Sequence, residues 1–487
     1  MDPIKMDVST QEAMKWPQYL AGLLASLPML CTGSVTSWTS PALAHLQRPG
    51  NGTEGLSAHE ASWVGSMMPL GAIVGAVPAG FLADLLGRRL LLLLLAVPFL
   101  LGWVLVIVAG YSVPLLYTAR FISGFAVGAT TVAIPLYNEE ISEVKIRGML
   151  GCYLDFMITA GFLWCYVINA FVDYFWLTVL CAVQPAVFFL SFAWMPESPV
   201  HLLAKGRDDQ AEEALRFFRG AKHVAGYDTR PEMQCMREFL KEGRTDEAGV
   251  ESGSSRMGYI WECLFRRGPV STTAKAMRII FGLVIVAQTT GIQGVIYNTV
   301  DIFERGEGSL SPYLCNTLIA VIQFVLSLVT LMLVDRVGRK LFLYLSGAGM
   351  SISIALLALH FYLKNIDGLY VENFGWVPCI SVTLFISTYA SGFGPLPWLI
   401  MSEIVPTESK AWVGSICVFL SWSLQFIVTK LHIIMITELG DDVTYGLFCV
   451  LCVLSTVYVA VWLPETKNKT RAEIQTKLKG NQEMTKL

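Results

Sequence analysis

Three charged motifs occur twice in this chain, in the same order in each half. The motif DLLGRR (84–89) recurs as DRVGRK (335–340), and PESP (196–199) recurs as PETK (464–467). Between them, Glu140 with Arg147 recurs as Glu403 with Lys410. Each copy lies at the end of an apolar segment that is long enough to cross a membrane. Such a duplicated set of charged loops is typical of a transporter built from two lobes, with its substrate site between them.

The chain is poor in charge for its length, since 54% of its 487 residues are hydrophobic and 15% are charged. That leaves too little polar surface for a soluble protein of this size. The net charge of −3 gives no reason to expect a nucleic-acid partner. We therefore predict an all-α membrane protein whose twelve transmembrane helices form two six-helix, pseudo-symmetric lobes.

Windows of about 20 apolar residues define the predicted spans. They are 17–39, 61–82, 90–110, 113–137, 149–170, 174–195, 277–300, 312–334, 341–362, 376–401, 411–435 and 443–463. The predicted divisions are an N-terminal lobe (1–195), a linker (196–276), a C-terminal lobe (277–463) and a tail (464–487). In the linker, residues 208–220, 232–241 and 257–266 are expected to form short helices.

Loop charges predict the orientation of the spans. Basic residues of the repeated motifs and the linker fall on one side, whereas the other side carries a sparse, mostly acidic set. The positive-inside bias puts the linker, the tail and both termini in the cytoplasm. The first span is interpreted as an uncleaved helix, because eleven more follow it. Asn51-Gly52-Thr53 then lies outside, so Asn51 is expected to carry a glycan, whereas Asn468 in the tail is not.

Taken together, the motifs resemble those of the sugar porters of the major facilitator superfamily, and the resemblance covers the whole chain. It includes the QTTGI run (288–292) and GPLPW (394–398) as well as the charged loops. The segment WTSPAL (38–43) and the short tails are most similar to insect trehalose and hexose facilitators. The resemblance implies facilitative transport of a neutral sugar, trehalose or a hexose, across the plasma membrane by alternating access. The expected partners are the sugar and membrane lipid, with no obligate protein partner.

No enzyme activity is expected. The chain has no phosphate-binding GxxxxGK[ST] run, which argues against ATP-driven pumping. It also has no convincing nucleophile constellation or metal-ligand spacing, so we expect neither a cofactor nor a metal.

The repeated loops predict a cytoplasmic gate. Glu140 and Arg147 are seven residues apart, too far for a direct pair on one helix, so their expected partners are Lys410 and Glu403 of the other half. Such pairs would clamp the lobes together and break when the path opens inward. Lys410 stands where the family usually has Arg, which should weaken its clamp. The alternative is static packing of the loops. The other predicted gate residues are Asp84, Arg88, Arg89, Asp335, Arg336 and Arg339.

Polar side chains inside the spans predict a sugar site, because sugars bind amides, hydroxyls and an aromatic face. Gln288, Gln293 and Tyr297 share one face only if their span is bent or broken, which Gly291 and Gly294 permit. The family usually has Gln at Ala287 and Glu at Ala390, so its usual hexose is not assumed. The alternative for each amide is an interhelical hydrogen bond, and for Trp398 core packing. The candidates are Gln288, Gln293, Tyr297, Asn298, Gln323, Trp398, Ser421 and Gln425.

Asp155 is an acid inside the fifth span, where the family usually has Gln. An ionisable residue in a membrane is a candidate for function, and three roles stay open: sugar binding, a structural contact and proton transfer. The first span has no acid opposite Arg120, so we expect uniport and a structural role for Arg120. Two alternatives remain for the chain, namely a proton–sugar symporter that uses Asp155 and a non-transporting sugar sensor.

Overall fold

The computed structural model describes residues 14–48, 55–110, 112–143, 146–221, 227–238, 240, 272–306, 311–366, 374–405 and 407–465. Twelve helical segments within these residues are long and apolar enough to cross a membrane. The predicted all-α fold with twelve spans is therefore confirmed. Asn51, the predicted helix 257–266 and the tail from residue 466 lie outside the described residues.

The first lobe contains six spans, the first of which is interrupted at Trp38. Its helices are α1 (Trp16–Ser37), α2 (Thr39–Leu46), α3 (Ala58–Leu86), α4 (Arg88–Ala109), α5 (Val113–Ile141), α6 (Arg147–Asn169) and α7 (Tyr174–Phe192). Two short helices, α8 (Pro199–Ala204) and α9 (Asp208–Phe218), follow them. The predicted linker helix over 208–220 is thus confirmed as α9.

The second lobe repeats this arrangement with two broken spans. Its helices are α12 (Thr272–Thr289), α13 (Ile292–Tyr297), α14 (Thr299–Arg305), α15 (Pro312–Val337), α16 (Arg339–Ile366), α18 (Val377–Ser391), α19 (Leu396–Ile404), α20 (Thr407–Leu439) and α21 (Asp441–Trp462). The predicted break in the span over residues 277–300 occurs at Gly291, whose φ of 81° favours glycine.

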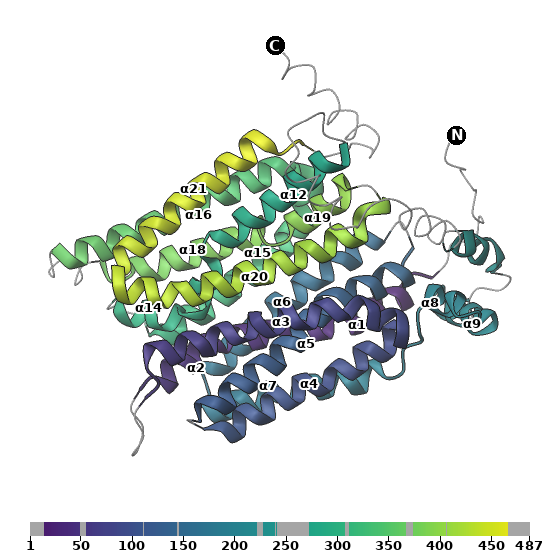
Figure 1. Ribbon diagram of the computed structural model, residues 1–487, viewed down its shortest axis with the longest axis horizontal. Coiled ribbons are helices and arrows are strands. Elements are labelled where there is room, and N and C mark those ends of the chain that lie inside the picture. Colours follow the sequence, from purple (N-terminus) through teal and green to yellow (C-terminus); the bar gives the residue numbers. More distant parts are fainter. Residues whose placement is uncertain are drawn as a thin grey trace, which may run out of the picture.

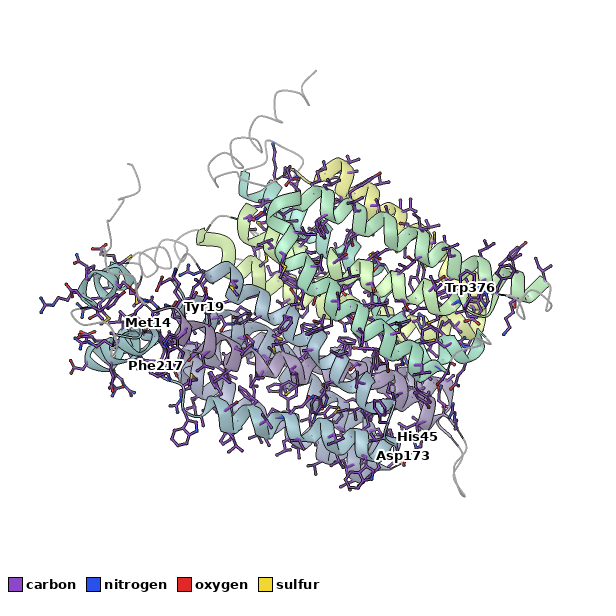
Figure 2. The ribbon with its side chains drawn as sticks, turned by 180° about the vertical axis from the view of Figure 1, so that it is seen from behind. Met14, Tyr19, His45, Asp173, Phe217 and Trp376 are labelled. Atoms are coloured by element: carbon purple, nitrogen blue, oxygen red, sulfur yellow. The ribbon has the colours of Figure 1, made fainter. Side chains whose placement is uncertain are left out.

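The two lobes lie side by side along the length of the bundle (Figure 1). We call the end with α8 and α9 the motif end, and the end with α2 and α14 the far end. Figure 2 shows Met14 and Phe217 at the motif end and His45, Asp173 and Trp376 at the far end.

Helices α8 and α9 pack on the first lobe. Leu202, Leu215 and Phe218 are buried in the same apolar cluster as Tyr137 of α5 and Phe192 of α7. The Phe218 and Tyr137 rings meet edge to face with their centroids 6.4 Å apart. The start of the linker is therefore part of the core of this lobe.

Candidate functional site

The repeated loops form the same turn in both lobes. Gly87 and Gly338 have φ values of 97° and 106°, a conformation that favours glycine. After the first turn, the Glu197 carboxylate accepts hydrogen bonds from the backbone N–H groups of Arg88 and Arg89, each at 3.0 Å. An acid at this position satisfies free N–H groups at the start of α4 and interacts favourably with the helix dipole.

Glu465 does the same for the second lobe. Its carboxylate accepts hydrogen bonds from the N–H groups of Arg339 and Lys340, both at 3.2 Å. The Lys340 side chain also donates to the carbonyl of Ala460 at 2.8 Å. The glutamates of PESP and PETK are thus helix caps, a role that the sequence analysis did not assign. The signal in the sequence is their repeated position: each glutamate directly follows the sixth predicted span of its half, and each half also carries one glycine turn.

Arg88 joins several groups at the motif end of the first lobe. Its Nη2 lies 2.9 Å from Glu140 Oε1 and 2.9 Å from Asp84 Oδ1, and the Ser198 hydroxyl donates to the other oxygen of Glu140. Arg88 Nη1 donates to His201 Nδ1 at 2.8 Å. This contact requires a neutral imidazole, and burial and the Arg88 charge both lower the pKa of His201.

The expected pairs between the lobes are not formed among the described side chains of this conformation, and the clamp stays a prediction. Glu140 pairs with Arg88, and Glu403 pairs with Arg339 at 3.1 Å, each within its own lobe. Arg147 lies 3.6 Å from Glu139 rather than against Glu403. The reason is that each lobe supplies its acid with its own arginine at the start of the helix after the glycine turn. The side chains of the remaining predicted gate residues, Asp335, Arg336 and Lys410, lie outside the described part of the structure.

Polar contacts between the lobes gather at the far end instead. The Ser40 hydroxyl lies 2.7 Å from the Thr299 hydroxyl and accepts a hydrogen bond from the Val300 N–H at 3.0 Å. Arg48 forms an ion pair with Glu304 across the same interface. The broken first span of the first lobe (α1–α2) therefore meets the end of the broken first span of the second lobe (α13–α14) at the far end.

Arg120 supports the break between α1 and α2. The side chain is buried, and it donates to the Val35 carbonyl at 2.8 Å and to the Thr39 hydroxyl at 2.6 Å. Its guanidinium lies 5.5 Å from the centre of the Trp38 ring. Among the described residues it has no carboxylate partner. Carbonyl groups near a helix break need donors inside a membrane, and Arg120 supplies one.

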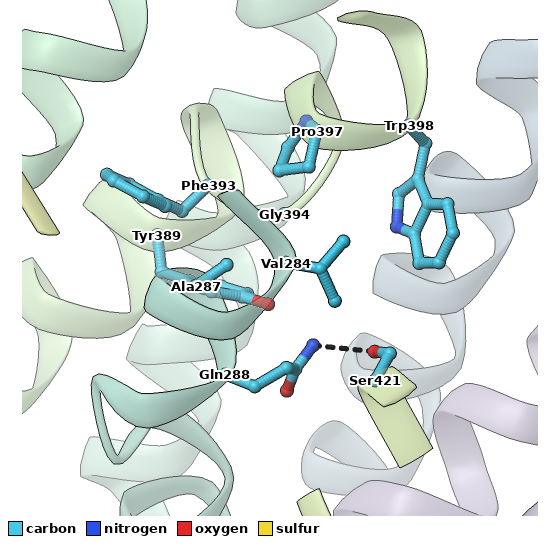
Figure 3. Close-up of a pocket in the computed structure, with 9 residues that line it drawn as sticks. All are labelled: Val284, Ala287, Gln288, Tyr389, Phe393, Gly394, Pro397, Trp398 and Ser421. Carbon is cyan, nitrogen blue, oxygen red and sulfur yellow. Dashed lines mark hydrogen bonds between the residues drawn. The ribbon is translucent and has the colours of Figure 1, made fainter. Parts of the chain in front are cut away.

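A small, partly open pocket of about 20 Å³ lies in the second lobe between α12, α18, α19 and α20 (Figure 3). Gln288 Nε2 donates to the Ser421 hydroxyl at 2.8 Å, and the Trp398 ring lies across the pocket from this pair. Gln288 Oε1 is buried and has no hydrogen-bond partner among the described residues. The pocket thus contains an aromatic face, a hydroxyl and a free amide acceptor, the groups that a sugar requires. Its other lining residues are Val284, Ala287, Tyr389, Phe393, Gly394 and Pro397.

Two further predicted amides also have free acceptors. The Oε1 atoms of Gln293 and Gln323 are buried without a hydrogen-bond partner in the described part of the chain. Buried polar groups in proteins are normally paired. These two residues and Gln288 are therefore predicted site amides with an acceptor available for a ligand.

Other predicted site residues are occupied by protein partners. Gln425 Nε2 donates to the Tyr297 hydroxyl at 3.1 Å, and that hydroxyl lies 3.9 Å from the sulfur of Met68 in α3. Asn298 Nδ2 donates to the Gly294 carbonyl at 2.8 Å and lies 3.2 Å from His432 Nδ1. The interhelical alternative therefore describes these amides in this conformation.

Asp155 lies on α6 in the first lobe and is partly buried. One turn further along α6, the Thr159 hydroxyl lies 3.3 Å from Ser327 of α15. The α6 face that carries Asp155 and Thr159 is therefore directed towards the second lobe.

Sequence reasoning missed Asn316 of α15. Its side chain is fully buried, and neither Nδ2 nor Oδ1 has a hydrogen-bond partner among the described residues. The signal in the sequence is its spacing of seven residues from Gln323, which places both amides on one side of a helix.

The fold is shared with solved structures of the xylose transporter XylE from E. coli. The inward-open structure of the xylose transporter XylE from E. coli aligns with a TM-score of 0.75 at 23% identity, over 94% of this chain and 99% of that one. A partially occluded inward-open structure of XylE gives 0.74 at 24% identity, over 93% and 99%.

The family model described as "Sugar (and other) transporter" matches residues 16–478, and the chain belongs to this family. It is 32% identical over 472 residues to the facilitated trehalose transporter Tret1 of Aedes aegypti, covering 97% of this chain and 56% of that protein. The Culex quinquefasciatus protein of the same name is 32% identical over 463 residues, with 95% and 86% covered. The chain thus spans little more than half of the Aedes relative.

Proposed function

We propose that this sugar-transporter family member is a facilitative transporter that moves a neutral sugar, trehalose or a hexose, across the plasma membrane. The observation that carries the proposal is the central pocket, where Gln288 presents a free acceptor beside Ser421 and opposite Trp398. The names of the curated relatives support trehalose as the first sugar to test.

In this proposal the motif end faces the cytoplasm, because the basic residues of the repeated motifs gather there. Lobe contacts at the far end, such as Ser40 with Thr299, then correspond to closure on the outside. Asn51 would lie outside as well and stays a predicted glycosylation site. Sugar would exchange between the two sides as the lobes rock about the central site.

Counterflow of labelled sugar in proteoliposomes tests this function. Vesicles loaded with unlabelled trehalose or glucose should take up the labelled form of the transported sugar, with no need for a pH gradient. Vesicles without protein are the control for leakage. Specific sugar binding without counterflow would contradict transport and favour a sensor.

A proton-coupled symporter is the second candidate, and Asp155 is the observation that favours it. A carboxylate directed towards the other lobe is placed to exchange a proton as the lobes move. Against this, the described contacts of Arg120 are with a carbonyl, a hydroxyl and a ring, so this cation has no acid to switch with.

Replacing Asp155 with Asn distinguishes the two candidates. For a uniporter, Asp155→Asn should change sugar affinity or preference while flux stays insensitive to a protonophore. Uphill accumulation driven by an inward proton gradient in the unmodified protein, and abolished in Asp155→Asn, would establish symport.

A further inference from the structure

Asn316 is a buried amide that no hydrogen bond in the described part of the chain explains. The side chain has 0% exposure, and both of its polar atoms lack partners among the described residues. Each unsatisfied atom destabilises the folded protein compared with an apolar side chain of similar size. An amide kept in such a position is suited to a ligand that supplies both a donor and an acceptor.

The side of α15 that carries Asn316 faces the first lobe. Asn316, Gln323 and Ser327 are separated by seven and four residues, so they lie within about 40° of one another around the helix. Ser327 makes its 3.3 Å contact with Thr159 of α6 across the lobe interface. Near the other end of the helix, the Thr317 hydroxyl donates to the Tyr166 carbonyl of α6 at 3.1 Å. Ser327 thus places its side of α15 at the boundary between the lobes, and Asn316 and Gln323 lie on the same side of the helix.

Asn316 and Gln323, the two unsatisfied amides on this side of α15, are two helical turns apart. Seven residues correspond to about 10.5 Å along the helix axis. Gln323 lies near the middle of α15, and Asn316 lies nearer the far end. One pyranose ring is too short to reach both amides, whereas two linked rings match this separation.

We propose that Asn316 and Gln323 bind different rings of one disaccharide, with Asn316 as an outer subsite and Gln323 as part of the central site. This assignment rests on the proposed function of sugar transport. An amide donates from Nδ2 and accepts at Oδ1, which suits two neighbouring hydroxyls of a pyranose. A disaccharide such as trehalose contacts both subsites, whereas glucose uses only the central one.

The test is a pair of leucine variants, Asn316→Leu and Gln323→Leu, in the full-length protein. Because Leu replaces a group without partners, the melting temperature of unliganded Asn316→Leu should be unchanged or higher. Its affinity for trehalose should fall about tenfold and its affinity for glucose less than twofold, measured by ligand-induced thermal shifts. Gln323→Leu should weaken the binding of both sugars.

A buried hydroxyl away from this side of α15 provides the control. Ser353 of α16 donates to the Gly349 carbonyl of its own helix, so Ser353→Ala should leave both affinities unchanged. Three results would overturn the assignment: equal losses for trehalose and glucose in Asn316→Leu, no loss for either, or a lower melting temperature without ligand. If the unmodified protein transports sugar but does not bind trehalose, only this inference fails; if it neither binds nor transports any sugar, the proposed function fails too.

Discussion

At the scale of single residues, the central spans are distinguished by which amides have partners and which do not. Gln425 and Asn298 bind other side chains, so their polarity holds helices together in this conformation. Gln288, Gln293 and Gln323 keep a buried acceptor free. Because an unsatisfied acceptor is costly unless a ligand uses it, the second group is the better basis for a sugar site.

Gln288→Ala should weaken sugar binding without unfolding the protein. Loss of one or two hydrogen bonds corresponds to about 1–3 kcal/mol, or about a 5- to 150-fold lower affinity. The measurement is sugar binding to purified protein in detergent. Gln184→Ala is the matched control, because Gln184 also donates to a serine hydroxyl, Ser34, and has a buried Oε1 without a partner among the described residues, but it does not line the pocket. Its removal should affect stability rather than affinity. Unchanged binding in folded Gln288→Ala would remove this residue from the site.

His201 should make stability depend on pH. Its folded-state pKa lies below the ordinary value of 6.5. Its contribution to the free energy of unfolding is therefore fully present above pH 6.5 and is lost as the pH falls below 6.5. His201→Gln cannot take up the proton, so the loss of melting temperature between about pH 7.5 and pH 5.5 should be smaller in this variant. An exposed histidine, His59, provides the control substitution His59→Gln. An identical pH dependence in His201→Gln and the unmodified protein would contradict this role.

At the scale of elements, hydropathy predicts the spans because each must match the thickness of a bilayer. The break at Gly291 is also predictable, since glycine tolerates positive φ. The interruption at Trp38 was not predicted, because it depends on Arg120, which is distant in sequence. The pairs within each lobe at the motif end were not predicted either. Repetition of an acid and a base does not say whether they meet within a lobe or between lobes.

The two capping glutamates should be important for stability in the same way. Glu197→Ala and Glu465→Ala each remove an acceptor from N–H groups at the start of a helix, which should cost about 0.5–2 kcal/mol. Thermal unfolding in detergent measures the effect. Glu213→Ala, at an exposed position of α9, should change the melting temperature little. A melting temperature of either cap variant equal to that of Glu213→Ala would rule out the capping role.

At the scale of the whole molecule, the ion pair between the lobes among the described residues, Arg48–Glu304, lies at the far end, whereas the acid–base pairs at the motif end lie within the lobes. Alternating access requires two states of similar free energy, so that a small change in contacts shifts their populations. The Arg48–Glu304 pair is partly exposed, and such pairs contribute about 0.2–1 kcal/mol. That is enough to change the ratio of the two states by about 1.4- to 5-fold.

Glu304→Gln should therefore favour opening of the far end. Spin labels at Asp173→Cys and Trp376→Cys, in different lobes at that end (Figure 2), should report a larger share of long distances. The exposed Cys235 is replaced by Ser in this background. Glu60→Gln is the control, because Glu60 accepts hydrogen bonds from Ser57 within its own lobe. A shift of the same size in the control, or none in Glu304→Gln, would contradict the interlobe role.

The contacts of Arg88 and Glu140, which lie entirely within the first lobe, have a consequence for folding during synthesis. Once residues 197–201 have left the ribosome, Glu197, Ser198 and His201 can complete the contacts of Arg88 and Glu140, and no residue of the second lobe is needed for them. Synthesis proceeds from the N-terminus, and units that satisfy their own polar groups can fold in that order. The first six spans can therefore reach their native packing while the second six are still being translated, which shortens the time that charged side chains spend unpaired beside the membrane.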